Sequence, residues 1–254
     1  QAARDFKHVS LELGGKSPNI VFADANLDDA VNGAVSGIFA ATGQTCIAGS
    51  RLLLQDRVHD QVLERLLSIA RTARMGDPMD PTTQVGPVTT RPQYEKVLGY
   101  IDIARAEGAK LELGGKAASR SECGNGWFVE PTIFSGVDNR MRIAQEEVFG
   151  PVLSVIRFAD EAEAVAIAND VRFGLGAGVW TSDIGRAFRM AEAVQSGTVW
   201  INTYRAVSYM SPFGGYKDSG LGRENGIDAV REYLQTKSVW VNTGATTANP
   251  FVMR

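Results

Sequence analysis

Cys46 and Glu12 are the two residues of this sequence whose types and surroundings suit covalent chemistry. Cys46 ends the segment Gly43-Gln44-Thr45-Cys46, which follows an apolar helical pattern. A turn flanked by glycine leaves backbone N–H groups free to lower a thiol pKa or to bind an oxyanion. Glu12 lies in the apolar run Val9–Leu13, where desolvation should raise the pKa of its carboxyl and suit it to general-base work. A thiol nucleophile and a base together suggest covalent chemistry on a carbonyl compound.

Each of these residues also has a plain structural alternative. A lone cysteine is most often a small buried hydrophobe. Glu12 could be an edge-strand glutamate that points at solvent, and Lys16 could be its charge partner or a surface lysine. Cys123 lies in the polar loop Ser121–Asn125 and is interpreted as a surface thiol.

A second group of residues could bind a sugar and a flat ring. Glu146 and Glu147 stand next to each other, and Phe149 follows them just before an apolar strand pattern. Adjacent acids can accept hydrogen bonds from sugar hydroxyls, and an aromatic side chain can stack on a ring. The alternative is a solvated acidic turn.

Two glycine-rich segments look like phosphate-binding loops, and we reject both. Gly15-Lys16-Ser17 resembles the end of a P-loop, but Ser10 stands where that motif requires glycine, and Pro18 follows where a helix should open. In Gly220–Gly226 the third glycine comes one residue late, and no strand directly precedes it. The sequence therefore contains no credible motif for binding phosphates.

Composition excludes several classes of protein. The 254 residues are 44% hydrophobic and carry a formal charge of −3, so no basic field indicates nucleic acid. No apolar run approaches a membrane span of ~18 residues. Two cysteines and two histidines suggest neither a disulfide framework nor a histidine-based metal site. A reducing cytoplasm is the expected location.

Strand and helix patterns alternate along the chain, and these elements must position Cys46, Glu12 and Glu147. Short apolar runs predict strands, and apolar stripes of helical period lie between them. This alternation predicts an α/β fold with a largely parallel sheet flanked by helices, with its site at the carboxyl ends of strands. After the last helix, near 227–234, residues 237–242 alternate as a strand would, either pairing with another subunit or forming an ordinary edge strand. The expected strands are 19–22, 51–55, 110–113, 127–134, 152–158, 176–180 and 198–202, and the helical stripes begin near 27, 58, 94, 160 and 184.

Five separated motifs, taken in order, resemble the aldehyde dehydrogenase superfamily of NAD(P)-dependent enzymes over essentially the whole chain. The resemblance implies that Cys46 attacks the aldehyde carbon to give a thiohemiacetal and then a thioester, that its backbone N–H forms half of an oxyanion hole, and that Glu12 is the base. The motifs are Glu12–Pro18, Gly43–Cys46, Glu146–Pro151, Trp200–Tyr204 and Pro212–Gly220.

The resemblance also implies the binding residues. Glu147 would hold the nicotinamide ribose of NAD or NADP, Phe149 would pack beside it, and the backbone of Leu13 would approach the carboxamide. Lys16 would be a partner in the family's Glu–Lys arrangement. The residues that would line the substrate tunnel are Tyr204, Val207, Phe213 and Thr45.

The family's N-terminal cofactor-binding domain has no counterpart here, and the abrupt start at Gln1 suggests a chain cut from a larger protein. The resemblance divides the chain into 1–14 (end of the cofactor-binding domain), 15–217 (catalytic domain), 218–235 (returning helix) and 236–254 (oligomerisation strand and tail). We expect a homo-dimer or homo-tetramer at full length, a small aldehyde as substrate, and no useful dehydrogenase activity from the isolated chain. The alternatives are a relative that transfers its acyl group to CoA, and a non-catalytic module that retains the fold.

Overall fold

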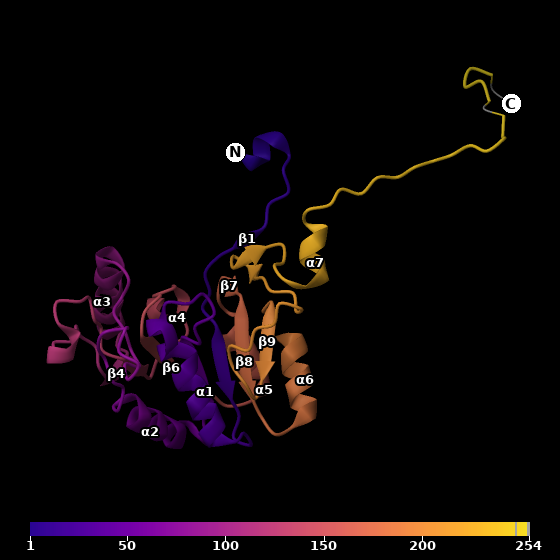
Figure 1. Cartoon of the computed structure of the whole chain (residues 1–254). Coiled ribbons are helices and arrows are strands. Elements are labelled where there is room, and N and C mark those ends of the chain that lie inside the picture. The colour runs from indigo at the N-terminus through magenta and orange to yellow at the C-terminus, as the bar shows by residue number, and fades with distance from the viewer. Residues whose placement is uncertain (247, 253–254) are drawn as a thin grey trace.

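A computed structural model, which describes residues 1–246 and 248–252, has a seven-stranded sheet at its centre (Figure 1). The strand order is β4-β5-β6-β3-β2-β8-β9, and only the β4–β5 pair is antiparallel. The α/β prediction with a largely parallel sheet is confirmed. The strands are β2 (Pro18–Val21), β3 (Arg51–Gln55), β4 (Lys110–Leu113), β5 (Thr132–Ser135), β6 (Val152–Phe158), β8 (Gly176–Trp180) and β9 (Thr198–Ile201).

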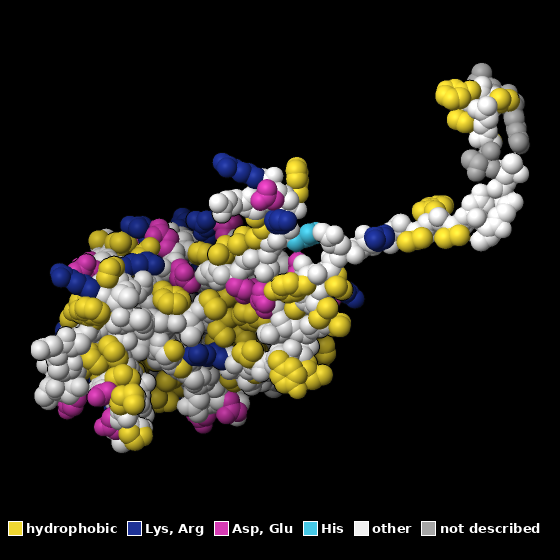
Figure 2. Space-filling view, turned by 45° about the horizontal axis from the view of Figure 1, so that its top comes forward, with side chains coloured by type: hydrophobic (Ala, Val, Ile, Leu, Met, Phe, Trp, Pro, Cys, Tyr) yellow, Lys and Arg dark blue, Asp and Glu magenta, His cyan; other side chains and the backbone are white. Residues whose placement is uncertain are grey.

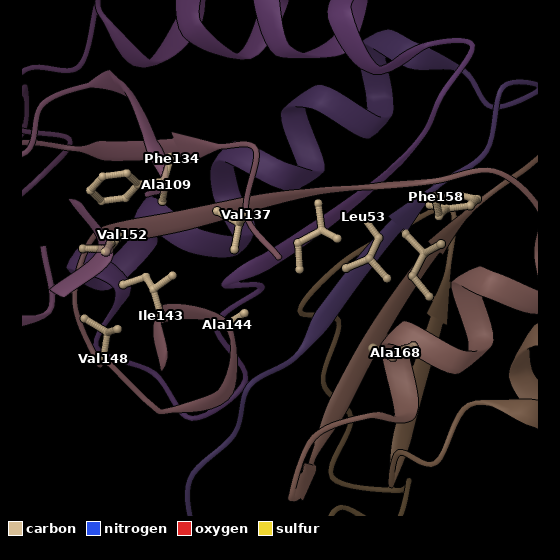
Figure 3. Packing of buried hydrophobic residues seen from close by; sticks show 14 of the residues in the cluster. Leu53, Ala109, Phe134, Val137, Ile143, Ala144, Val148, Val152, Phe158 and Ala168 are labelled. Atoms are coloured by element: carbon tan, nitrogen blue, oxygen red, sulfur yellow. The ribbon is translucent and has the colours of Figure 1, made fainter. Parts of the chain in front are cut away.

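Helices cover both faces of this sheet. Side chains of α1 (Leu27–Phe39) and α2 (His59–Ala70) pack on one face. The other face carries α3 (Arg91–Ala106), α4 (Arg142–Gln145), α5 (Glu161–Asn169) and α6 (Ile184–Ala193). Leu53 of β3 points into this second layer, where Phe134 and Phe158 also lie (Figure 3), whereas Leu52 and Leu54 point into the first. Burial on both faces explains why the strands are continuous apolar runs.

Local signals set most of the element boundaries. The Asn26 side chain accepts hydrogen bonds from the N–H groups of Asp28 and Asp29, so it caps α1. The predicted strand 127–134 shrinks to β5, because Pro131 has no N–H to donate to a ladder. Before Pro131 only an isolated bridge joins Val129 to Ala117.

Two cations cap the carboxyl end of α5. The guanidinium of Arg51, which is fully buried, donates to the carbonyls of Ile167 and Ala168 at 2.8 Å each. The ammonium of Lys217 donates to the carbonyls of Asn169 and Val171. These carbonyls lack helical partners, and a positive charge suits the negative end of the helix dipole. Arg51 also donates to the backbone carbonyl of Lys16 at 3.0 Å, which ties that segment to the helix.

Two short strand pairs lie above the sheet, and one of them joins segments near the two ends of the chain (Figure 1). β1 (Leu11–Glu12) pairs with β11 (Gly220–Leu221), and β7 (Phe173–Gly174) pairs with β10 (Tyr216–Lys217). A 3-10 helix, η1 (Ala2–Asp5), precedes β1. The final helix, α7 (Gly226–Arg231), is shorter than expected.

The predicted strand at 237–242 forms no ladder with the described residues of this chain. It extends away from the body, and Val239, Trp240 and Val241 line it as exposed side chains (Figure 2). The ordinary edge strand is therefore not found, and pairing with another subunit stays a prediction. The division of the chain into four regions also stays a prediction.

The described residues contain no helix with the length and apolar character needed to cross a membrane. They also contain no group of three or more His, Cys, Asp or Glu side chains arranged to hold a metal ion.

Candidate active site

Three segments that are distant in sequence meet at the amino-terminal ends of three adjacent strands. Gly14 and Gly15 lead into β2, Cys46 precedes β3, and Glu147 precedes β6. Because β6, β3 and β2 are neighbours in the sheet, the segments entering them converge. The expectation of a site at the carboxyl ends was wrong, since it assumed that the loops leaving the strands carry the chemistry.

Gly14 and Gly15 form the point of contact between these segments. The N–H of Gly15 donates to Oε1 of Glu147 at 3.0 Å. A Cβ atom on Gly14 would collide with the carboxylate of Glu147, and one on Gly15 would collide with the backbone carbonyl oxygen of Cys46. Only glycine permits both approaches, so this pair holds the thiol segment and the acid together.

Cys46 is half-buried, and burial raises the pKa of its thiol. The backbone N–H groups of Ile47 and of Cys46 itself act in the lowering direction, whereas the charges of Glu12 and Glu147 raise it further. The predicted backbone N–H groups do act to lower the thiol pKa, but the prediction of a lowered pKa was wrong, because burial outweighs them. A thiol in this environment needs a base to take its proton.

The backbone before Cys46 is strained. Ala41 and Thr42 have left-handed φ angles of 51° and 56°, and Gly43 follows with 68°. Phe149 also has a positive φ, of 57°. Such conformations cost on the order of 1–3 kcal/mol per non-glycine residue and cluster at functional sites.

Glu12 lies in the two-residue edge strand β1 and is exposed, so the prediction of a buried carboxylate was wrong. The pKa of its carboxyl is nevertheless raised, first by partial burial and then by the nearby charge of Glu224. The charge of Glu12 is also one of the causes, after burial, that raise the pKa of the Cys46 thiol. Sequence reasoning missed Glu224, because nothing in its local pattern indicates that β11 and its flanking loop bring it to β1.

The two adjacent acids have different surroundings. Glu146 accepts a hydrogen bond from Tyr100 at 2.5 Å and a bidentate pair from Arg142, and these partners lower its pKa to about 2. Glu147 accepts from Gly15 and keeps acceptor capacity for another ligand. Of the two acids, Glu147 is therefore the one available to bind a sugar hydroxyl.

Gln93 holds the turn that contains Phe149. Its Nε2 donates to the carbonyls of Val148 and Phe149 at 2.8 and 2.9 Å, and the Phe149 side chain is half-buried. Sequence reasoning missed Gln93, since it lies in the first turn of a helix with no distinctive motif.

Tyr204 packs against the segment that follows Cys46 and is hydrogen-bonded to it. It is buried, its hydroxyl donates to the carbonyl of Ile47 at 2.9 Å, and its ring packs against Trp200 at 4.9 Å between centroids. Its ring lies so close to Gly37 and Gly49 that side chains there would meet it. Its predicted place in a substrate tunnel stays a prediction.

The remaining predicted residues lie around these. Val207 is exposed and Phe213 half-buried, and both line a cleft of about 320 Å³. The Thr45 hydroxyl is buried and bonds to no described group. Leu13 is exposed, and its N–H donates to the carbonyl of Ser219. Lys16 is 2% exposed, so the surface-lysine alternative is wrong.

A further hollow lies apart from the converging side chains. It measures about 800 Å³, with Gln44 and Trp127 in its walls, and none of Cys46, Glu12 and Glu147 lines it. The convergence of side chains therefore marks the candidate site better than cavity size does.

Known proteins with this arrangement are aldehyde dehydrogenases. Residues 1–239 match the model of the aldehyde dehydrogenase family. A betaine aldehyde dehydrogenase of Mesorhizobium japonicum is 48% identical over 250 residues, which are 98% of this chain and 51% of that protein. The chain thus spans about half the length of the curated relatives it matches.

Solved structures give the same result. A putative aldehyde dehydrogenase from Burkholderia cenocepacia superimposes with a TM-score of 0.95 at 48% identity, over 98% of this chain and 51% of that one. Betaine aldehyde dehydrogenase from Staphylococcus aureus in complex with NAD+ gives a TM-score of 0.96 at 42% identity, over 98% and 50%. The match of the family model, the identity to curated relatives and the shared fold together show that this chain belongs to the aldehyde dehydrogenase family.

Proposed function

We propose that this chain provides the nucleophile, the base and the ribose-binding acid of an enzyme that oxidises an aldehyde to a carboxylate with NAD or NADP. The supporting observation is the convergence of Cys46, Glu147 and the glycine pair Gly14–Gly15 at the ends of three neighbouring strands. The substrate is a small-molecule aldehyde.

Cys46 performs the first step. Its thiolate attacks the aldehyde carbon, a C–S bond forms, and the carbonyl π electrons move to oxygen to give a thiohemiacetal. The backbone N–H groups of Cys46 and Ile47, which act on the sulfur, are suited to hold the oxygen anion. Because burial raises the pKa of the thiol, proton removal by Glu12 is part of this step.

The cofactor fits the free acid of the site. Glu147 has acceptor capacity left, and glycine at position 14 keeps its carboxylate unobstructed, because a Cβ atom there would collide with it. Glu147 would hold the ribose hydroxyls, Phe149 would pack beside the ring, and the Leu13 backbone would face the carboxamide. When bound, NAD or NADP supplies the acceptor for the hydride that leaves the carbon bonded to Cys46, and a thioester remains.

Glu12, which is exposed, releases the proton taken from the thiol to solvent and then assists hydrolysis. It takes a proton from water, the water oxygen attacks the thioester carbon, and the C–S bond breaks to return the thiolate and release the acid. The raised pKa of Glu12 brings this carboxylate closer to neutral pH, where a base works best.

Hydrolysis of p-nitrophenyl acetate tests this assignment, because acyl transfer through Cys46 requires no hydride acceptor. We expect slow turnover by the chain that Cys46→Ala abolishes. Cys123→Ala is the matched control, since Cys123 is the other cysteine and lies in a separate small hydrophobic cluster, where it is buried and not the surface thiol that was predicted. A Cys46→Ala variant as active as the wild type would refute the proposal, provided that circular dichroism shows both to be folded.

A further inference from the structure

Tyr204 is a buried side chain whose hydroxyl reaches the segment that carries the nucleophile. It is 9% exposed, and its hydroxyl donates to the carbonyl of Ile47 at 2.9 Å. No other group among the described residues donates a hydrogen bond to this carbonyl. Burial raises the pKa of the phenol, so the hydroxyl keeps its proton and remains a donor at neutral pH. The carbonyl of Ile47, a buried residue, therefore depends on Tyr204 for its hydrogen bond.

The ring of Tyr204 lies in a glycine socket, which is formed by Gly37 of α1, Gly49 and Gly178 of β8. A Cβ atom on these three residues would come within 3.1, 3.1 and 2.6 Å of the ring. Side chains there would displace the ring, so only glycine admits it at this place. The ring also packs against Trp200. Contacts on several sides therefore leave the hydroxyl little freedom to move away from Ile47.

The backbone on both sides of Tyr204 is strained. Asn202 and Arg205 have left-handed φ angles of 52° and 64°. The Asn202 side chain is fixed by the backbone of Thr181, whose N–H donates to it and whose carbonyl accepts from it. The guanidinium of Arg205 donates to the carbonyl of Ser36 in α1 at 3.3 Å. Strain of this kind persists where the surroundings impose it, and it is found most often at functional sites.

The carbonyl that Tyr204 holds belongs to the turn that contains the thiol. The N–H of Ala48 donates to the carbonyl of Thr45 at 3.0 Å, which closes a four-residue turn with Cys46 and Ile47 at its two central positions. The N–H groups of these two central residues are the ones that act on the sulfur. An anchor on the Ile47 carbonyl restricts rotation of the turn, so the two N–H groups keep their direction.

We propose that Tyr204 is a positioning residue, whose hydroxyl anchors the Ile47 carbonyl and so keeps the N–H groups of Cys46 and Ile47 directed at the thiol sulfur. This inference rests on the proposed function only for the role of Cys46 as nucleophile. The anchoring itself stands on the hydrogen bond, the glycine socket and the turn. A tyrosine that served only the packing of the core would stabilise the fold without acting on the thiol.

The first test is the pH profile for alkylation of Cys46 by iodoacetamide. It is measured on the whole chain in a Cys123→Ala background, so that Cys46 is the only thiol. Tyr204→Phe removes the hydroxyl and keeps the ring in its socket, so the variant should fold. We expect its profile to move to higher pH by about half a unit to one unit, because the N–H groups that stabilise the thiolate lose their fixed direction. The alkylation rate at pH 8 should fall by about three- to tenfold.

Thr132→Val is the matched control. Thr132 is buried in β5, its hydroxyl donates to the carbonyl of Glu130 at 2.7 Å, and valine has nearly the same shape. β6 separates β5 from β3, so this change lies outside the thiol turn. Both variants should lower Tm by a few degrees, because each leaves a carbonyl without its donor. Only Tyr204→Phe should move the alkylation profile.

Hydrolysis of p-nitrophenyl esters then distinguishes positioning from contact with the substrate. Tyr204→Phe should lower kcat for p-nitrophenyl acetate by ~10–10²-fold and leave KM unchanged, because the thiol turn is less well placed. The loss should be the same for p-nitrophenyl hexanoate. A change confined to KM, or one that grows with the acyl chain, would place Tyr204 in the wall of the substrate tunnel and overturn the inference.

An alkylation profile that stays in place in Tyr204→Phe would also overturn the inference, and so would an equal shift in Thr132→Val. The proposed function fails by a different result, namely ester hydrolysis that survives Cys46→Ala. In that case a shifted alkylation profile would leave the anchoring of the turn by Tyr204 standing.

Discussion

Replacing Gly15 by alanine tests the arrangement at its tightest point. The new Cβ atom would lie closer than 3.0 Å to the backbone carbonyl oxygen of Cys46, whereas ordinary contact begins at 3.4 Å. The atom that the new Cβ would meet belongs to the backbone, so it cannot rotate away as the end of a flexible side chain could. The two segments must separate by about 1 Å, and a displacement of that size commonly costs ~10²-fold in rate.

The same change should also weaken the fold. Overpacking of a dense region costs about 1–3 kcal/mol, and in a protein of this size each kcal/mol lowers Tm by about 2–4 °C. The hydrogen bond from the Gly15 N–H to Glu147 would lengthen as the segments part. Catalysis should therefore suffer far more than stability.

The assay is hydrolysis of p-nitrophenyl acetate by Gly15→Ala beside thermal unfolding of the same sample. Gly99→Ala is the matched control, because Gly99 lies within α3 with no atom within 4 Å of its would-be Cβ. That variant should keep full activity and gain about 0.5–1 kcal/mol, the usual benefit of alanine within a helix. Full activity in Gly15→Ala would refute the reasoning, since it would mean that the contact with Cys46 does not position the thiol.

The other predictions concern charge, stability and the cofactor. Glu12→Gln removes a negative charge that raises the pKa of the Cys46 thiol, so alkylation of Cys46 by iodoacetamide at pH 8 should become faster, by less than about tenfold. The same variant lacks the base, so ester hydrolysis should become slower by ~10²–10⁴. Equal effects on both rates would contradict a base role. Glu146→Gln should lower Tm at pH 7, and the difference should shrink as pH falls from about 4.5 to about 2, because the folded pKa of Glu146 lies below its ordinary value; a difference unchanged at pH 2.5 would count against the Arg142 pairing. Arg51→Met should lower the free energy of unfolding measured in urea by about 3 kcal/mol or more, because several buried carbonyls lose their hydrogen-bond donor and each costs ~1–3 kcal/mol unpaired. A loss under 1 kcal/mol would show that these carbonyls find other partners. With an aldehyde and NAD or NADP, the 254-residue chain should give no steady production of reduced cofactor, because its sequence has no phosphate-binding motif; production that Cys46→Ala abolishes would contradict this.

Periodicity in the sequence was sufficient to predict the sheet and its helices. β3, β6 and β8 lie at the residues predicted, because strands buried on both faces are continuous apolar runs. β4 also lies at the residues predicted, although it is an edge strand whose residues alternate between polar and apolar. The sequence also indicates the start of α1, because Asn26, a residue type favoured at helix N-caps, directly precedes it. Residues 237–242 differ from these strands. Their side chains alternate as in a strand, but they form no ladder with the described residues.

The site was harder to predict, because it depends on contacts between distant segments. Nothing local to Glu12 shows that it is exposed, and nothing local to Glu224 shows that β1 pairs with β11 beside it. The pairing of Glu146 with Arg142 likewise follows from how α4 leads into β6. The motifs indicated which residues matter, and the strand order decided where they meet.

The left-handed backbone at Ala41 and Thr42 has a consequence for any programme of thermostabilisation. Glycine adopts such angles without the steric penalty, so a selection for heat resistance alone should favour Ala41→Gly, on the exposed side of the turn, early. The gain in melting temperature would come with a looser approach to Cys46. Heat-selected and activity-selected libraries should therefore diverge first at this turn, and their sequences there would report which property each selection rewarded.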